Sequence, residues 1–77
     1  MPSRLAKLAT IRAASQAGTS RNVRVAAGLS LREVADYVGV GVSTIYRWET
    51  GERRPYGKAA LRYGDLIAEL EGIRDPA

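Results

Sequence analysis

The stretch LSLREVADYVGVGVSTIYRWETGERRP, residues 29–55, carries the clearest structural signals in the chain. Ser30 and Glu33 have the spacing of a capping box, in which each side chain hydrogen-bonds a free backbone amide of the other residue. This pair predicts a helix over about 31–38. Gly39 follows where the chain must turn sharply, because glycine accepts a positive φ at no steric cost.

A second short helix is expected over about 42–50, with its N-cap at Gly41 and its end at Gly51. At about 100° per residue, Ile45 and Trp48 fall on one apolar face. Thr44 lies at the border of this apolar face. The opposite face, with Val42 at its leading end, carries groups that can hydrogen-bond: Ser43, Tyr46, Arg47 and Thr50. The stretch therefore predicts two helices, a tight turn between them, and one outward polar face.

An N-terminal helix is expected over 3–17, with Ser3 as its N-cap and Gly18 as its stop. On this helix Leu5, Leu8 and Ala9 are predicted to share one face, and Arg4, Lys7 and Arg12 lie outside it. Three roles are open for the helix: packing on the core, self-association, or lying along a DNA backbone.

Two more helices complete the expected fold. One should start from a cap at Thr19 or Ser20 and end near residue 27, before a left-handed Gly28. The last should cover about 57–71, with Gly64 as a weak point in the helix. Its expected core positions are Ala60, Leu61, Ile67 and Leu70. The predicted fold class is all-α, a compact bundle of about five helices, divided into a basic helix (1–18), a central domain (19–71) and a frayed tail (72–77).

Composition excludes several classes of function. A chain of 77 residues fits one small domain. It contains neither cysteine nor histidine, so the usual ligands for zinc and the usual side chains for thiol or imidazole catalysis are missing. We therefore expect no enzyme, no metal and no cofactor. There is no apolar run of about 20 residues for a membrane span, and we expect a cytoplasmic protein that binds neither membrane nor small-molecule ligand.

The distribution of charge points to a polyanion. The net charge is +4, and ten of the twelve basic residues are arginine, which suits bidentate contacts with phosphate and guanine. Residues 1–28 carry five basic side chains and no acidic one. Among the charged residues of 63–77, most are acidic. A solvated surface without a partner is the alternative explanation of the charge alone.

The central stretch resembles a known family. Ala35, Gly39, Ile45 and Trp48 stand at the spacings of a helix-turn-helix, where they serve as small contact residue, turn glycine and two core residues. The string G-L-S at 28–30, followed by E-x-G-x-x-x-P from Glu49 to Pro55, is similar to the phage-repressor and Cro-like family, also called XRE-type. The resemblance covers roughly residues 20–70.

The resemblance implies that helix 42–50 enters the major groove of DNA with its N-terminal residues at the base edges. Carried over by position, it implicates Val42, Ser43, Thr44, Tyr46 and Arg47. It also implies a structural pair between Arg24 and Glu49. Leu31 departs from the family, which often has a phosphate-holding glutamine there, and Val42 can make only apolar contacts.

The residues themselves support the same site. Arg47 is the best candidate to read a base, since a bidentate arginine–guanine contact is worth about 1–3 kcal/mol of discrimination. Arg53 and Arg54 are placed to reach phosphates. The complete predicted DNA-binding set is Val42, Ser43, Thr44, Tyr46, Arg47, Thr50, Arg53 and Arg54.

These observations predict a sequence-specific double-stranded DNA-binding protein, a repressor/Cro-like transcriptional regulator that acts as a homodimer at the nucleoid. Two alternatives remain open. One is an excisionase-like architectural DNA-binding factor, whose STIYRW stretch (43–48) would look much the same. The other is a protein-interaction module on the same fold, either antitoxin-like or a polymerase-binding adaptor.

Overall fold

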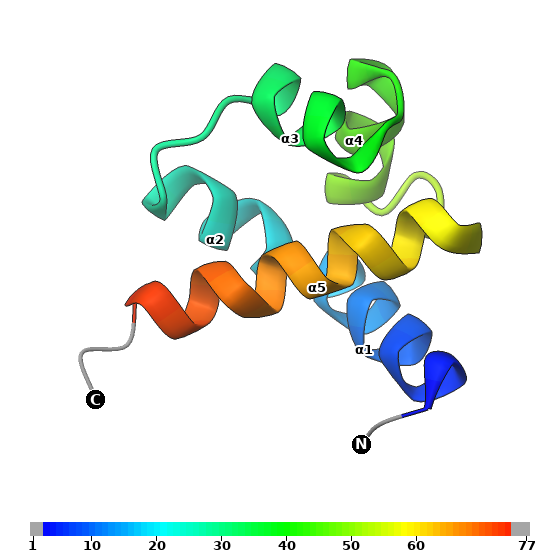
Figure 1. The fold of residues 1–77 in the computed structure, drawn as a ribbon. Coiled ribbons are helices and arrows are strands. Elements are labelled where there is room, and N and C mark those ends of the chain that lie inside the picture. The colour runs from blue at the N-terminus through cyan, green and yellow to red at the C-terminus, as the bar shows by residue number, and fades with distance from the viewer. Residues whose placement is uncertain (1–2, 75–77) are drawn as a thin grey trace.

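The longest helix of the protein, α5, supports most of the others (Figure 1). The computed structural model describes residues 3–74, which contain five helices and no strand. The helices are α1 (Arg4–Ala17), α2 (Thr19–Ala26), α3 (Leu31–Val38), α4 (Val42–Glu49) and α5 (Gly57–Arg74). Helix α5 packs against α1, α2 and α3, while α3 packs on α4. The predicted all-α fold of about five helices is confirmed.

The capping box at the start of α3 is confirmed. The Ser30 hydroxyl accepts a hydrogen bond from the Glu33 backbone N–H at 3.0 Å, and the Glu33 carboxylate accepts one from the Ser30 N–H at 2.9 Å. At the other end of α3, Gly39 adopts φ +88° and its N–H bonds the carbonyl of Ala35. These local contacts fix both ends of the first helix of the predicted pair.

All five helices contribute residues to the core, where the inner face of α4 reaches α5. Ile45 and Trp48 are buried as predicted, and the Trp48 ring lies 5.2 Å from the ring of Tyr63, tilted by 37°. Tyr63 was not among the expected core positions, although it is completely buried. The helical spacing of Ala60, Tyr63 and Ile67 would have identified it.

The apolar face expected on α1, with Leu5, Leu8 and Ala9, is not the face that packs on the core. Ile11 and Ser15 are the buried residues of this helix, and Leu8 packs only partly against the core. Leu5 is 74% exposed, and Ala9 is exposed too. Because α1 meets α5 at the level of Ile11, the helix turns that side inward. Of the three roles left open for this helix, packing on the core is the one seen.

The boundaries of α2 and α5 also differ from expectation. The N-cap of α2 is Gly18, with φ +82° and no side-chain hydrogen bond, so the predicted caps Thr19 and Ser20 were wrong. Helix α5 continues to Arg74, beyond the predicted end at 71. The frayed tail was expected over 72–77. Residues 72–74 belong to α5, and 75–77 lie outside the described residues.

Gly64 allows α1 and α5 to approach closely. A Cβ atom at this position would lie 3.2 Å from the Cβ of Ile11, a contact tighter than ordinary van der Waals packing. Glycine in a helix interior costs about 1 kcal/mol relative to alanine. The weak point predicted from the sequence is therefore a place where the two helices approach closely.

We expect Gly64→Leu to lower the free energy of unfolding by about 1–3 kcal/mol, the usual cost of overpacking a filled site. Gly72→Ala is the control, because nothing lies within 4 Å of the added methyl group on the same helix. That variant should be neutral or gain up to about 1 kcal/mol. Urea denaturation measures both. Equal stability of Gly64→Leu and the parent protein would contradict the close contact.

The capping box should make stability sensitive to acid. Hydrogen bonds from the Ser30 backbone N–H and hydroxyl lower the pKa of Glu33 below its ordinary value of 4.5. A lowered folded-state pKa stabilises the fold above the ordinary value, and the benefit is lost as the pH falls through the folded-state pKa. We therefore expect acidification to below pH 4.5 to lower the melting temperature less in Glu33→Gln than in the parent.

Melting curves from neutral to acid pH test this, with Glu69→Gln as the control. The structure shows no hydrogen bond to the exposed Glu69 carboxylate from any described residue. A Glu33→Gln variant with the parent's full acid sensitivity would show that the capping carboxylate does not contribute.

Candidate nucleic-acid interface

The outer face of α4 presents three side chains to solvent, and Thr50 adds a fourth directly after the helix. Ser43, Tyr46, Arg47 and Thr50 are exposed, and the Tyr46 side chain remains 53% accessible. On the opposite side, Ile45 and Trp48 are almost completely buried. The division of α4 into an anchoring face and a presented face is confirmed. Because the anchoring face cannot leave the core, the presented face has a fixed direction.

The other predicted DNA-contact residues in and just after α4 are less free to bind a partner. Val42 and Thr44 are half-buried, and Val42 packs against the hydrophobic core. Thr50 follows the last residue of α4, and its hydroxyl donates a hydrogen bond to the carbonyl of Arg47 at 3.2 Å. This hydroxyl can still accept a hydrogen bond. The free donors of the face are therefore concentrated on Ser43, Tyr46 and Arg47.

The loop after α4 is held at both ends. The Arg53 backbone N–H donates to the carbonyl of Arg47 at 3.2 Å, which folds the loop back onto the helix. Pro55 is buried, and its carbonyl accepts a 2.8 Å hydrogen bond from Nε of Arg12 on α1. Arg53 and Arg54 remain exposed between these two anchors. The role of Arg12 was not foreseen, because nothing local in the sequence links it to a loop 43 residues away.

A buried ion pair joins α2 to α4. The Arg24 guanidinium donates from Nε to the Glu49 carboxylate at 2.5 Å and from Nη2 at 3.0 Å. Its Nη1 donates to the carbonyl of Leu29 at 2.8 Å. Glu49 is only 6% exposed, and hydrogen bonding to it raises the pKa of Arg24. The pair implied by the family resemblance is therefore present, and it is structural.

A second arginine connects α3 to α5. Nε of Arg62 donates to the carbonyl of Tyr37 at 2.6 Å, at the C-terminal end of α3. The guanidinium also lies over the Tyr37 ring, with its carbon 4.6 Å from the ring centre. This combined contact fixes α3, on which α4 rests, relative to α5.

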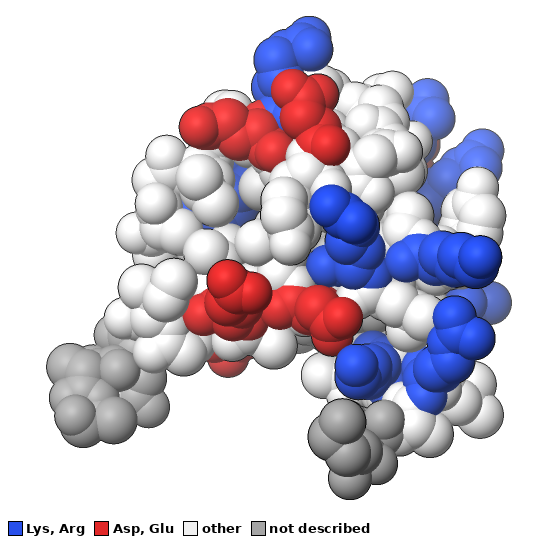
Figure 2. Space-filling view, in the orientation of Figure 1, with Lys and Arg blue, Asp and Glu red and all other residues white. Residues whose placement is uncertain are grey.

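The charged side chains are partly separated on the surface. Figure 2 shows most Lys and Arg gathered on the right of the view, where α1 and α5 begin, and Asp and Glu along the second half of α5. Over α3, acidic side chains lie beside a basic one. Among residues 3–74 there is no group of three acidic, cysteine or histidine residues that could hold a metal ion. No helix in this part of the chain is long and apolar enough to cross a membrane.

The profile of the helix-turn-helix family matches residues 21–63, more than half of the chain. The match includes the ion-paired Arg24 and Glu49, all of α3 and α4, and the loop that follows. It excludes α1 and the second half of α5. Comparison with curated proteins and with solved structures gives no significant match.

We expect Glu49→Ala to destabilise the protein by about 3–5 kcal/mol, since it leaves the Arg24 charge without its partner in a largely buried site. Urea denaturation measures the loss. Glu52→Ala, three residues further on and exposed, is the control. The double variant Arg24→Met with Glu49→Leu should lose much less than Glu49→Ala alone, because no unpaired charge remains. Unchanged stability of Glu49→Ala would show that the pair does not hold α4.

Proposed function

Because the chain belongs to the phage-repressor and Cro-like (XRE-type) helix-turn-helix family of DNA-binding proteins, we propose that α4 enters the major groove of double-stranded DNA and reads its sequence. The observation that carries this proposal is the contrast between the two faces of α4. Ile45 and Trp48 anchor the helix, while Tyr46 and Arg47 project from it into solvent. The major groove, about 12 Å wide, accepts a helix of this kind.

The proposed contacts follow from the position of each side chain. Arg47, in the second half of α4, reaches guanine O6 and N7 together. Ser43, at the start of the helix, bonds a base or a phosphate. Tyr46 lies against a sugar-phosphate edge. Val42 and Thr44 contribute smaller contacts at the border, because both are half-buried.

The exposed arginines of the loop supply affinity without sequence choice. Arg53 and Arg54 extend beyond the C-terminal end of α4 and reach backbone phosphates, and Thr50 lies beside them. Each neutralised phosphate releases condensed counterions, so the affinity falls as salt increases. The hydrogen bonds at Arg53 and Pro55 keep this loop beside the recognition helix.

In this proposal the protein is a repressor/Cro-like transcriptional regulator that occupies an operator in the cytoplasm of a bacterial cell. One module of this size buries too little DNA surface for tight specific binding, so two copies bind a two-fold site. Neither a cofactor nor a small-molecule ligand enters the scheme.

We expect Arg47→Ala and Arg54→Ala to affect DNA binding in different ways. Sites are first selected from a random duplex pool, and affinities are then measured for selected and random DNA. Arg47→Ala should cost about 1–3 kcal/mol on the selected site and relax the choice at one base pair. Arg54→Ala should weaken binding to all sequences alike and reduce the salt slope by about 1.

Arg21→Ala is the control, since Arg21 is exposed and belongs to α2, not to α4 or the loop that follows it. Equal losses on selected and random DNA for Arg47→Ala would show that Arg47 does not read a base. An affinity for duplex DNA that changed neither with salt concentration nor in the double variant Arg47→Ala with Arg53→Ala would refute DNA recognition and favour a protein-interaction module.

A further inference from the structure

The first turns of α1 and α5 lie beside each other at one end of the molecule. An open hollow of about 430 Å³ lies between them, and its charged residues are Arg4 of α1 and Lys58 of α5. At about 100° per residue, Arg4 is on the same side of α1 as the buried Ile11 and Ser15, two turns or more before them. Helix α1 therefore directs Arg4 toward the start of α5, beyond the edge of the core.

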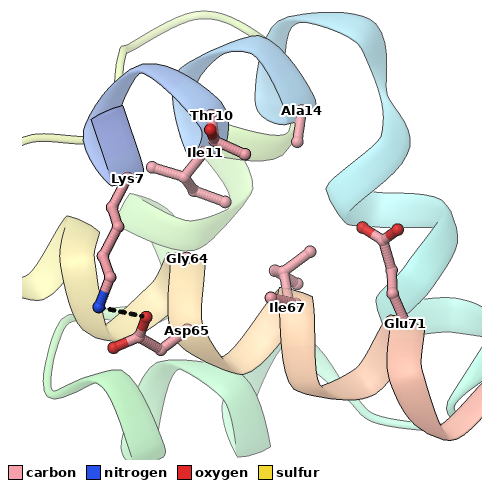
Figure 3. Close-up of a pocket in the computed structure, with 9 residues that line it drawn as sticks. Lys7, Thr10, Ile11, Ala14, Gly64, Asp65, Ile67 and Glu71 are labelled. Atoms are coloured by element: carbon pink, nitrogen blue, oxygen red, sulfur yellow. Dashed lines mark ion pairs between the residues drawn. The ribbon is translucent and has the colours of Figure 1, made fainter. Parts of the chain in front are cut away.

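The two basic side chains of the hollow are exposed and unpaired. Among residues 3–74, neither Arg4 nor Lys58 forms an ion pair, and the first turns of α1 and α5 contain no acidic residue. Lys7, one turn after Arg4, differs from them, because its ammonium lies 3.5 Å from the Asp65 carboxylate (Figure 3). The charges of Arg4 and Lys58 are therefore available to an anion, whereas that of Lys7 is already paired.

The hollow continues the basic loop that follows α4. Lys58 comes four residues after Arg54, and Pro55 between them accepts the 2.8 Å hydrogen bond from Arg12 of α1. Glu52 is the only acidic residue between α4 and α5. In Figure 2, basic side chains run down the right edge of the view, from beside α4, past the start of α5, to the start of α1. We call this surface the basic strip and define it by its unpaired members: Arg53, Arg54, Lys58 and Arg4.

We propose that the basic strip extends the contact with DNA beyond the bases that α4 reads, with Arg4 and Lys58 bound to phosphates in the flanking duplex. The inference rests on the proposed function, which puts Arg53 and Arg54 on the same backbone. Arg4 is eight residues before Arg12, so at about 1.5 Å per residue it lies about 12 Å along α1 from the residue that holds the loop. That distance corresponds to about three to four base pairs of B-DNA.

The hollow also suits the sugars of a DNA backbone. Its apolar side chains are Leu5, which is 74% exposed, and the half-buried Leu8 and Leu61. Deoxyribose carbons alternate with phosphates along each strand, so apolar side chains between two cations match that alternation. Such contacts with phosphate and sugar position a protein on the duplex and carry no sequence information. The strip should therefore add affinity and salt dependence, and no choice of base.

Duplexes that carry the selected site with flanks of increasing length test the proposal with the full chain. The parent should bind about three- to tenfold more tightly once each flank is about four base pairs longer, and gain little from further extension. In the double variant Arg4→Gln with Lys58→Gln, the affinity should not depend on flank length. The salt slope on the long duplex should fall by about 2 for each copy bound. The ratio of affinities for selected and random DNA of equal length should stay unchanged.

Arg21→Gln is the matched control for Arg4→Gln, because it removes the same charge from an exposed arginine in the first turn of another helix. Arg4→Lys keeps the charge and should retain the parent's dependence on flank length and salt. Far-UV circular dichroism verifies that each variant is folded. Equal effects of Arg21→Gln and Arg4→Gln would overturn the proposal. So would a parent protein whose affinity is the same at every flank length.

Two further results separate this inference from the proposed function. Binding that requires Arg47 but changes neither with flank length nor in the Arg4 and Lys58 variants would refute the extended contact alone. Binding that requires Arg4 and Lys58, is equal on selected and random DNA, and is unchanged by Arg47→Ala would refute sequence reading alone. A chain that cosediments with phosphatidylglycerol vesicles through Arg4, and shows no effect of flank length, would assign the strip to a lipid surface and would also overturn the proposal.

Discussion

The orientation of α4 depends on the ion pair between Arg24 and Glu49. Burying a carboxylate costs free energy unless the group is paired and hydrogen-bonded. Any rotation of α4 about its axis, or shift along the core, would break the pair and leave the Glu49 charge buried without a partner. The third hydrogen bond of the guanidinium, to the Leu29 carbonyl, brings the segment before α3 into the same contact. One arginine thus joins α2, the approach to α3 and the end of α4.

Packing around this pair completes the support of α4. Trp48 rests on Tyr63, and burial raises the pKa of the Tyr63 hydroxyl. Arg62, one residue earlier on α5, holds the end of α3. Helix α5 therefore contributes to the position of both helices of the motif. Under the proposed function a side chain of α4 must meet a base edge within a fraction of an ångström, which requires such rigid support. Helix α4 is held through its core face, the Glu49 carboxylate at its C-terminal end and the loop that follows.

The sequence was informative where the signal is local and uninformative where distant helices cross. The capping box at Ser30, the turn at Gly39 and the two faces of α4 depend on residues within a few positions, and all were predicted correctly. The choice of Ile11 over Leu5 as the buried residue depends on where α1 meets α5, which no spacing within α1 reveals. The contact from Arg12 to Pro55 spans 43 positions and was missed for the same reason. The exposed set on α4 could be derived from periodicity, whereas its contacts with DNA remain predictions.

The hydrogen bond from Arg12 to the Pro55 carbonyl gives α1 a second role beside packing on the core. On one side of the helix Ile11 and Ser15 are buried, and on another Arg12 steadies the loop that carries Arg53 and Arg54. Helix α1 lies outside the family match, whereas the loop lies inside it. A segment outside the matched motif therefore helps to position two exposed arginines of that motif.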